Sequence, residues 1–321
     1  MTLTDAERST TAGAFWALAA AASFSANDVL VKFLASDYPL YQLMFVRSTV
    51  GMLFIVSVIL PLTGPPSTLL TKRLGLHLIR GGCVVFANFC FFLGLASLPL
   101  ANAVALFFIS PLIIAVFSVV FLGETVGPRR WAAIFVGLIG VVIVVRPGTS
   151  GFQIASLLPL AAAFGYATLH ILTRRIGGTE NATAMAFYIQ VTFFFVACIA
   201  GLALGDGKFD KFDHASLSFL FSAWVWPTLS DFLLMSALGV TSATGGYLIS
   251  QAYRRSEAAL VAPFEYTMLP LAVFWGLTIF DEWPDRIAWV GIVLIMASGL
   301  IFIWREAVSR RRATLITPKR L

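Results

Sequence analysis

The chain has 321 residues, of which 59% are hydrophobic and only 12% charged, and its formal net charge is +6. A soluble globular domain has about 45–50% apolar and roughly 25% charged residues, so this composition argues against a soluble fold. The basic residues lie between apolar runs and at the C-terminus, which favours a role in membrane topology over nucleic-acid binding.

Ten apolar segments can be placed along the chain, and a helix needs about 20 mostly apolar residues to cross a bilayer. In chain order they cover residues 13–35, 40–61, 75–96, 100–122, 130–146, 152–173, 182–204, 228–252, 257–280 and 286–304. The first segment is too long for a secretory signal and follows acidic residues, so we expect it to be a retained span. Two connections are long, 61–73 and 205–227, and the second ends in Trp224, Trp226 and Pro227, which is typical of an interfacial anchor.

The distribution of lysine and arginine predicts the orientation, because cytoplasmic loops carry an excess of them. With the N-terminus inside, 16 of the 22 basic residues fall on the inner side: Arg8, Lys72, Arg73, Arg80, Arg129, Arg130, Arg174, Arg175, Arg254, Arg255, Arg305, Arg310, Arg311, Arg312, Lys319 and Arg320. The outer side holds Arg146, Lys208, Lys211 and Arg286, while Lys32 and Arg47 lie within spans. Both termini are therefore expected in the cytoplasm, which requires an even number of spans.

The two halves of the chain resemble each other. Residues 97–146 and 255–305 share a mid-helix proline (Pro111, Pro270), an acid at a helix end (Glu124, Glu282) and a tryptophan that opens a Gly/Ala-rich span (Trp131, Trp289). Because each half has five spans, equivalent helices run in opposite directions, which makes an inverted repeat. Secondary transporters commonly have this plan, with the substrate site near the midplane between the repeats.

Several segments identify a family resemblance over nearly the whole chain. They are FSANDVLVKFL, MFVRS with Arg47, FLGETVGPRRWAAIFVGLIGVVIVVRPG and SEAALVAPFEYTMLPLAVFWGLTIFDEWP. The chain resembles the drug/metabolite transporter (DMT) superfamily, specifically the EamA type. The resemblance implies an all-α membrane protein with ten transmembrane helices in two inverted five-helix repeats, a central cavity, alternating access and no ATPase. It also implies a division into a cytoplasmic segment (1–12), two EamA-type repeats (13–146 and 152–305) and a basic cytoplasmic tail (306–321).

Three charged residues in the first two spans are candidate site residues, because ionisable groups inside a membrane usually face the bundle interior. Asp28 and Lys32 are four residues apart and share a helix face, and Arg47 lies at similar depth. They could form an outer gate or a site for a substrate carboxylate, with Arg47 as the donor fork. The alternative is a structural bridge from Asp28 to Lys32 or Arg47. Lys32 could also extend to the outer surface.

Glu265 is a candidate in the ninth span, between Pro263 and Pro270 and beside Tyr266. Two prolines free backbone carbonyls, and a broken helix is tolerated where it lines a cavity. A carboxyl group near the midplane could bind a substrate amine or carry a coupling proton. The alternative is a neutral glutamic acid that hydrogen-bonds a neighbouring helix.

Further polar groups could line the cavity, although each is more often an ordinary interhelical hydrogen-bonding group. They are Asn27, Asn88, Asn102, Tyr166, His170, Gln190, Tyr247 and Gln251. For Glu124 and Glu282, helix-end and loop contacts are favoured over substrate binding.

The sequence therefore predicts a secondary transporter of a small organic metabolite such as an amino acid, nucleobase, vitamin or S-adenosylmethionine-like solute. The alternatives are a multidrug or metabolite efflux carrier and, from other classes, an integral-membrane enzyme, an ion channel or a non-transporting scaffold. The three cysteines, Cys83, Cys90 and Cys198, lie in apolar runs without CxxC spacing or histidine partners, so no metal, disulfide or cofactor is expected. Expected partners are the solute, the lipid bilayer and a proton as candidate coupling ion, in a monomer or homodimer of the bacterial inner membrane.

Overall fold

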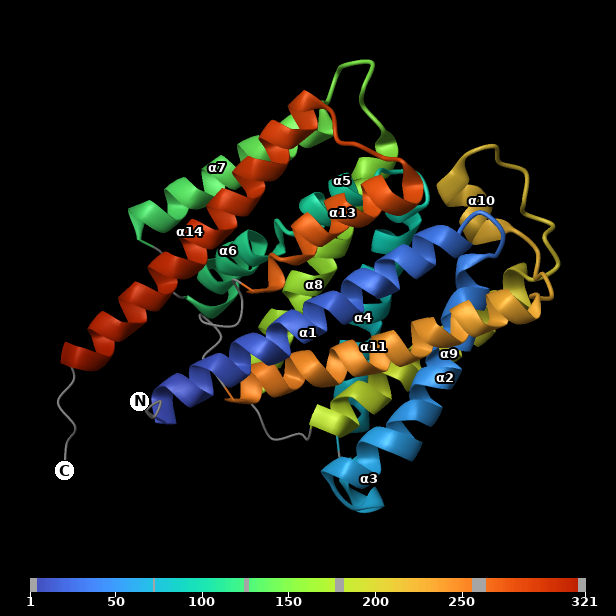
Figure 1. Ribbon diagram of the computed structural model, residues 1–321, viewed down its shortest axis with the longest axis horizontal. Helices are drawn as coiled ribbons and strands as arrows, with labels where there is room; N and C mark the ends of the chain where they lie inside the picture. Colours follow the sequence, from blue (N-terminus) through green and yellow to red (C-terminus); the bar gives the residue numbers. More distant parts are fainter. Residues whose placement is uncertain (1–4, 72, 124–126, 177–181, 256–263, 317–321) are drawn as a thin grey trace.

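The computed structural model of the chain is a bundle of helices (Figure 1). It describes residues 5–71, 73–123, 127–176, 182–255 and 264–316, without the side chains of 5–12, 122, 130, 170, 173–176, 182, 250, 253–255 and 306–316. The first half contains α1 (Asp5–Leu34), α2 (Leu40–Phe54), the π-helical turn η1 (Ile55–Ile59), α3 (Leu60–Thr63), the 3-10 turn η2 (Pro66–Leu69), α4 (Leu74–Leu95), α5 (Leu100–Phe107), α6 (Ser110–Leu122) and α7 (Pro128–Val145). The second contains the 3-10 turn η3 (Ile154–Ser156), α8 (Leu157–Ile176), α9 (Ala182–Leu204), α10 (Ala215–Phe221), α11 (Leu229–Arg255), α13 (Met268–Phe280) and α14 (Arg286–Ile316).

Ten apolar helical segments account for the ten expected spans. In the described part of the chain, seven are long and apolar enough to cross a membrane: Gly13–Leu34, Leu40–Thr63, Leu74–Leu95, Leu100–Phe121, Thr183–Leu204, Leu229–Ile249 and Arg286–Arg305. Three shorter apolar helices complete the set: Trp131–Val145, Ile154–Leu169 and Met268–Phe280. The chain is a multi-pass, all-helical membrane protein, as the composition predicted.

The helices pair as an inverted repeat requires. The first span packs on the eighth (α1 on α11), and the third packs on the sixth (α4 on α8). The second packs on the seventh (α2 on α9), the fourth on the ninth (α5 on α13) and the fifth on the tenth (α7 on α14). In the repeat, spans 1 to 5 correspond to spans 6 to 10. Replacing every span by its counterpart converts the pair 1–8 into 6–3 and leaves the pairs 2–7, 4–9 and 5–10 unchanged. The second half therefore packs against the first as an equivalent unit of opposite direction.

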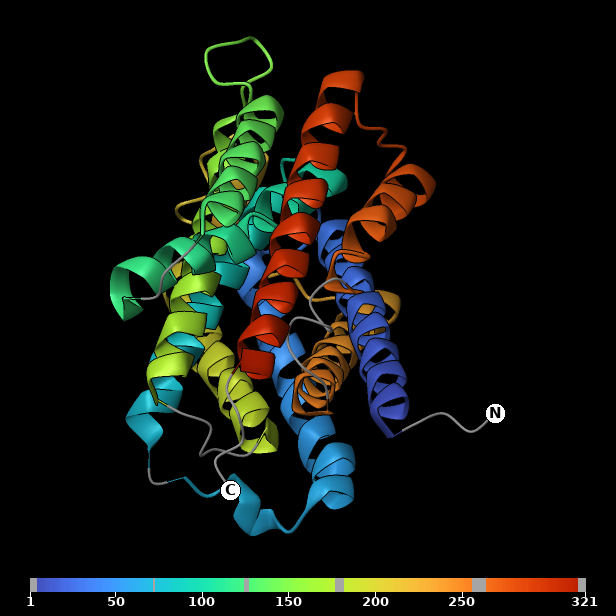
Figure 2. The same ribbon diagram turned by 90° about the vertical axis from the view of Figure 1, so that its left-hand side faces the viewer.

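The first described helix begins and the last one ends at the same end of the bundle. The start of α1 and the end of α14 are found there, on the side of α3, while residues 146–153 form a loop at the opposite end (Figure 2). This arrangement agrees with an even number of spans.

The fourth span of each half is broken, although 100–122 was expected to be one continuous helix. The first break lies at Phe108–Ile109, between α5 and α6, and the second at Tyr266–Thr267, before α13. The two breaks are 158 residues apart, like the Glu and Trp pairs of the repeat. Each precedes a proline, which has no N–H for the helix ladder and whose ring clashes with the carbonyl four residues earlier.

The last helix is longer than expected. α14 continues to Ile316, so much of the stretch 306–321 that was assigned to a tail is helical. The glutamate, alanines, arginines and leucine between residues 306 and 316 are strong helix formers, and no glycine or proline interrupts the stretch before Pro318.

Gly140 on α7 and Gly291 on α14 allow the fifth and tenth spans to approach closely. A methyl group at Gly140 would lie 2.9 Å from the Gly291 carbonyl oxygen and 2.9 Å from Ile295 Cγ1. We predict that Gly140→Ala lowers the free energy of unfolding by about 1–3 kcal/mol, because backbone must shift to admit the methyl group. Thermal unfolding in detergent measures this.

The matched control is Gly82→Ala on α4, where the added methyl group meets nothing within 4 Å. This variant should be as stable as the parent or slightly more stable, since alanine is a better helix former than glycine. Equal stability of the two variants would show that the close approach of α7 and α14 contributes nothing to the free energy of unfolding.

Candidate solute-binding site

Arg47 on α2 lies at the centre of the bundle. Its side chain is only 6% exposed. The guanidinium carbon lies 4.8 Å from the ring centroid of Phe193 on α9 and 5.6 Å from that of Phe92 on α4. Its Nη2 donates to Ser242 Oγ on α11 at 2.7 Å, and its Nη1 contacts Met44 Sδ at 3.2 Å. Four helices therefore meet at one buried cation, whose faces are covered by aromatic rings.

Asp28 on α1 is a nearby acidic group that does not touch Arg47. Its side chain is 7% exposed, and the two charges are near enough to attract each other. Their nearest nitrogen and oxygen atoms are nevertheless more than 4.0 Å apart, and no described residue donates a hydrogen bond to the Asp28 carboxylate. The expected alternative, a structural bridge from Asp28 to Arg47, is therefore not formed in this conformation.

Gln190 on α9 adds a third incomplete polar group. Its Nε2 donates to Ser242 Oγ at 3.3 Å, but within the described part of the chain its buried Oε1 accepts no hydrogen bond. The same holds for the buried Nε of Arg47, which donates to no described group. Unfilled buried donors and acceptors are rare because each costs the free energy of its lost hydration. Asp28, Arg47, Gln190 and Ser242 are called the polar centre below.

The repeat relates two members of the polar centre. Arg47 stands in the segment FVRST of the second span, and Gln190 stands in YIQVT of the seventh. Both side chains hydrogen-bond Ser242, one from each half of the protein. Sequence reasoning placed Gln190 only among general cavity candidates and missed Ser242. Aligning these two segments would have singled out Gln190.

Lys32 does not join the polar centre, although it lies one helical turn from Asp28. Its Nζ forms an ion pair with Glu282 Oε1 at 2.9 Å and donates to the carbonyls of Leu98 at 2.6 Å and Leu95 at 3.2 Å. The other oxygen of Glu282 accepts the N–H of Leu100, the first residue of α5, at 2.9 Å. This Lys32 cluster joins α1, the end of α4, the start of α5 and the turn after α13. The alternative of a structural bridge from Asp28 to Lys32 is therefore not formed in this structure, whereas the helix-end and loop contacts favoured for Glu282 agree with it.

A second ion pair lies at the same end of the bundle. Arg146 Nη2, just after α7, donates to Asp285 Oδ1, just before α14. This hydrogen bond, together with one from the Ala288 backbone N–H, lowers the pKa of the Asp285 carboxyl. The pair connects the fifth and tenth spans where each meets its loop.

Glu265 and Tyr266 lie at the break in the ninth span. The Tyr266 hydroxyl donates to the carbonyl oxygen of Phe108 at 3.3 Å, and the two rings are 4.9 Å apart. Glu265 lies within electrostatic range of the Tyr266 and Tyr166 hydroxyls. Tyr166 on α8 also packs its ring 5.4 Å from Phe107. The two helix breaks are thus in direct contact, with Glu265 beside them.

The remaining candidates are spread over the bundle. Asn27 donates to the Leu238 carbonyl and to Thr241 Oγ1 and so connects α1 to α11. Asn88 donates to the carbonyl four residues earlier, and the buried Oδ1 of Asn102 accepts no hydrogen bond from the described residues. Tyr247 packs against the apolar cluster around Ile55, while Gln251 is half-buried on α11. The side chain of His170, and Glu124 and Pro263 altogether, lie outside the described residues.

Residues 205–228 cover the end of the bundle that holds the Lys32 cluster. Gln42, fully buried on α2, exchanges two hydrogen bonds with the backbone of Val225, at 2.6 and 3.1 Å. Trp224 packs its ring 5.9 Å from Phe45, whereas Trp226 is 87% exposed. Of the two tryptophans, the exposed one has the placement expected of an interfacial anchor.

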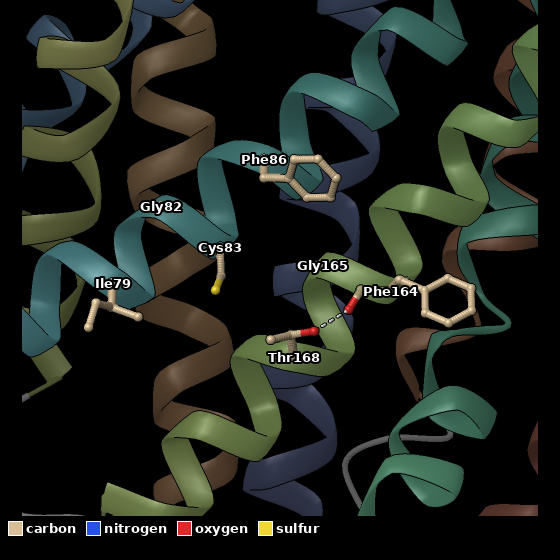
Figure 3. Close-up of a pocket in the computed structure, with 7 residues that line it drawn as sticks. All are labelled: Ile79, Gly82, Cys83, Phe86, Phe164, Gly165 and Thr168. Atoms are coloured by element: carbon tan, nitrogen blue, oxygen red, sulfur yellow. Dashed lines mark hydrogen bonds between the residues drawn. The ribbon is translucent and has the colours of Figure 1, made fainter.

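A groove of about 380 Å³ opens between α4 and α8, and no residue of the polar centre lines it (Figure 3). Its walls are mostly apolar and comprise Ile79, Gly82, Cys83, Phe86, Phe164, Gly165 and Thr168. Ile79, Phe86 and Phe164 are each at least half exposed, so the groove faces the outside of the bundle, where lipid surrounds a membrane protein. It holds none of the charged candidates.

Comparison with known proteins identifies the family. The model of the EamA-like transporter family matches residues 11–146. The riboflavin transporter of Rhizobium johnstonii is 30% identical over 310 residues, which cover 94% of this chain and 93% of that protein. The chain belongs to the EamA-like transporter family. Its family is thus one of transporters, which excludes the integral-membrane enzyme considered from the sequence.

Other relatives also cover most of the chain. The S-adenosylmethionine uptake transporter of Rickettsia bellii is 28% identical over 95% of this chain and 97% of its own. The pseudopaline exporter of Pseudomonas aeruginosa is 26% identical over 89% and 94%. A solved crystal structure superposes with a TM-score of 0.61 at 20% identity, over 95% of this EamA-like chain and 98% of the other. That likeness supports the fold.

The Lys32 cluster should contribute to stability. We predict that Lys32→Met lowers the free energy of unfolding by about 1.5–3 kcal/mol, because hydrogen bonds to a charged, largely buried group are lost. Thermal unfolding in detergent measures the loss. Adding Glu282→Gln should cost less than the sum of the two single changes, since the residues act on each other.

Asp281→Asn is the control, because Asp281 is exposed and its backbone, at φ 52°, lies in a region that asparagine tolerates. It should leave the unfolding temperature unchanged. Additive effects of the Lys32 and Glu282 changes would contradict a direct pairing in solution.

Proposed function

We propose that the chain is a secondary transporter that moves a small organic metabolite across the bacterial inner membrane by alternating access. The observation that carries the proposal is the contact between the two broken spans, where the Tyr266 hydroxyl donates to the Phe108 carbonyl. Irregular backbone at membrane depth is tolerated where it lines a cavity or is buried in protein. In transporters built of inverted repeats, broken helices at the repeat interface form the substrate site.

The packing supports alternating access. The polar centre is built from both halves, with Arg47 and Asp28 from the first and Gln190 and Ser242 from the second. A relative movement of the halves would open this centre towards one side of the membrane and close it from the other. The two five-helix repeats, residues 13–146 and 152–305, are the units that we expect to move relative to each other.

The names of the relatives support the substrate class. Those transporters are named for S-adenosylmethionine, riboflavin and pseudopaline, all small organic metabolites. Uptake is the leading proposal for this chain. Efflux is the alternative, because one of these relatives is named an exporter.

The basic residues support cytoplasmic termini, since 16 of the 22 fall on the side of the N-terminus. In the structure, the start of α1 and the end of α14 share one end of the bundle. Glu265, beside the second helix break, is the group that we propose for proton coupling.

Reconstitution tests the proposal. Purified protein in proteoliposomes should take up radiolabelled S-adenosylmethionine or riboflavin with saturation. It should also show counterflow, in which excess unlabelled solute inside accelerates entry of label. Protein-free liposomes give the background. Binding of either solute without counterflow would mean that the protein is not a carrier.

The coupling role of Glu265 is tested separately. We predict that Glu265→Gln abolishes the stimulation of uptake by an imposed pH gradient, because an amide cannot exchange a proton, and leaves counterflow in place. Asp281→Asn, at an exposed turn, should retain the full stimulation. If the Glu265 variant still responds to the pH gradient, proton coupling runs through another group.

A further inference from the structure

We propose that the two long connections of the chain are straps that close the two ends of the bundle in turn. Residues 205–225 are called the α10 strap, and residues 61–71 are called the η2 strap. The inference rests on the proposed transport function and identifies the segments that must release when the carrier opens. Each strap follows the second span of its own half and binds the second span of the other half.

The α10 strap belongs to the second half, since it connects α9 to α11. The N–H of Trp224 donates to the carbonyl oxygen of Gly205 at 3.1 Å, so the two ends of the strap lie together. The strap is therefore a closed loop that carries α10, at the end of the bundle opposite the N-terminus (Figure 1). A compact loop with joined ends can leave the bundle as one unit.

The first attachment of the α10 strap is to the start of α2, in the other half. Tyr41 and Gln42 are both fully buried there. The Tyr41 hydroxyl donates to the Ser222 carbonyl at 2.8 Å. Gln42 donates to the Val225 carbonyl at 2.6 Å and accepts the N–H of Val225 at 3.1 Å. Each of these bonds joins one half of the protein to the other.

The second attachment joins the start of α10 to the end of α4. Ser216 is buried, its Oγ donates to the Leu93 carbonyl at 2.6 Å, and its N–H donates to Ser97 Oγ at 3.1 Å. The hydroxyl oxygens of Ser97 and Ser216 are 2.7 Å apart. Lys32 donates to the carbonyl of Leu98, the residue after Ser97. The α10 strap and the Lys32 cluster therefore bind the same turn of the first half.

The η2 strap makes equivalent contacts at the end of the bundle where α1 begins (Figure 2). Tyr188 on α9 donates its hydroxyl to the Leu69 carbonyl at 3.0 Å. Thr63 Oγ1 hydrogen-bonds Thr183 Oγ1, at the start of α9, at 3.1 Å. The start of α9 is the repeat equivalent of the start of α2, where the α10 strap binds. The inverted repeat thus places one such connection at each end.

Alternating access requires a closing contact at each end of the carrier, and here each half supplies one. Both straps are attached in this conformation. Because each strap crosses from one half to the other, the halves cannot separate at an end while the strap there stays attached. Opening one end must therefore break the contacts of its strap together and leave the other strap in place.

Disulfides test whether release is required, in full-length protein whose native cysteines are replaced by alanine. The pair Ser97→Cys and Ser216→Cys locks the α10 strap, because the oxygens that the sulfurs replace are 2.7 Å apart. The pair Thr63→Cys and Thr183→Cys locks the η2 strap, where the oxygens are 3.1 Å apart. Each disulfide should lower counterflow of S-adenosylmethionine or riboflavin about 10-fold or more, with recovery on reduction.

The matched control is the pair Ser218→Cys and Ser222→Cys. Both serines lie within the α10 strap, with their oxygens 3.2 Å apart. Their disulfide joins the strap only to itself, so counterflow should stay unchanged. Mass spectrometry confirms that each disulfide has formed, and thermal unfolding shows that each variant is folded.

Hydrogen exchange measures release of the α10 strap without transport. If the strap releases as one unit, locking Ser216 to α4 should slow exchange of the Val225 N–H about 10-fold or more relative to the reduced protein. Gln42→Leu removes the two bonds to Val225 and should accelerate exchange of the Ser216 N–H about 10-fold.

The outcomes separate this proposal from the transport function. Counterflow that survives either locking disulfide would overturn the proposal of paired straps, while transport stands. Exchange at Val225 that ignores the lock at Ser216 would also overturn it. If the reduced protein transports neither solute, the transport function fails, and exchange at Val225 still decides whether the α10 strap releases as a unit.

Discussion

The buried charge of Arg47 is the constraint on which the centre of the bundle depends. A guanidinium cannot lose its proton under ordinary conditions, so the protein must surround it with compensating groups. Phe193, Phe92 and Ser242 do so from three different helices, and the acidic group of Asp28 lies nearby on a fourth. The positions of α1, α4, α9 and α11 around α2 are therefore coupled to one side chain.

Apolar packing and charged contacts stabilise different parts of this fold. Small residues and apolar packing hold the equivalent helices together, as at Gly140 and Gly291 between α7 and α14. Charged contacts gather at the end of the bundle, in the Lys32 cluster and the Arg146–Asp285 pair. Between these two zones lies the polar centre, the part of the described interior where opposite charges remain apart. Complete packing around an incomplete site is the expected design for a protein that must bind and then release its ligand.

The number of spans, the repeat and the family could be predicted because they depend on apolar length and on local motifs such as FLGETVGPRRW. The break at Phe108–Ile109 could not, since Pro111 alone does not decide between a kinked helix and an interrupted one. The partners of charged side chains were harder still to predict from the sequence. Lys32 lies four residues from Asp28, which suggested a local contact, but its partner Glu282 is 250 residues away and reaches it only through the packing of α13 against α1. Spacing along one helix shows which residues share a face, and only the tertiary fold shows what that face meets.

The Lys32 cluster has a mechanical consequence. One ammonium group is shared by the last carbonyls after α4 and by Glu282, whose other oxygen caps α5. Any separation of the halves at this end must therefore break two charge-assisted contacts together, the Lys32 ion pair and the hydrogen bond from Leu100, because both end on the one carboxylate of Glu282. If the halves move as proposed, this end would open in one step, and the Lys32 ammonium would stay on the two carbonyls of its own half while Glu282 leaves.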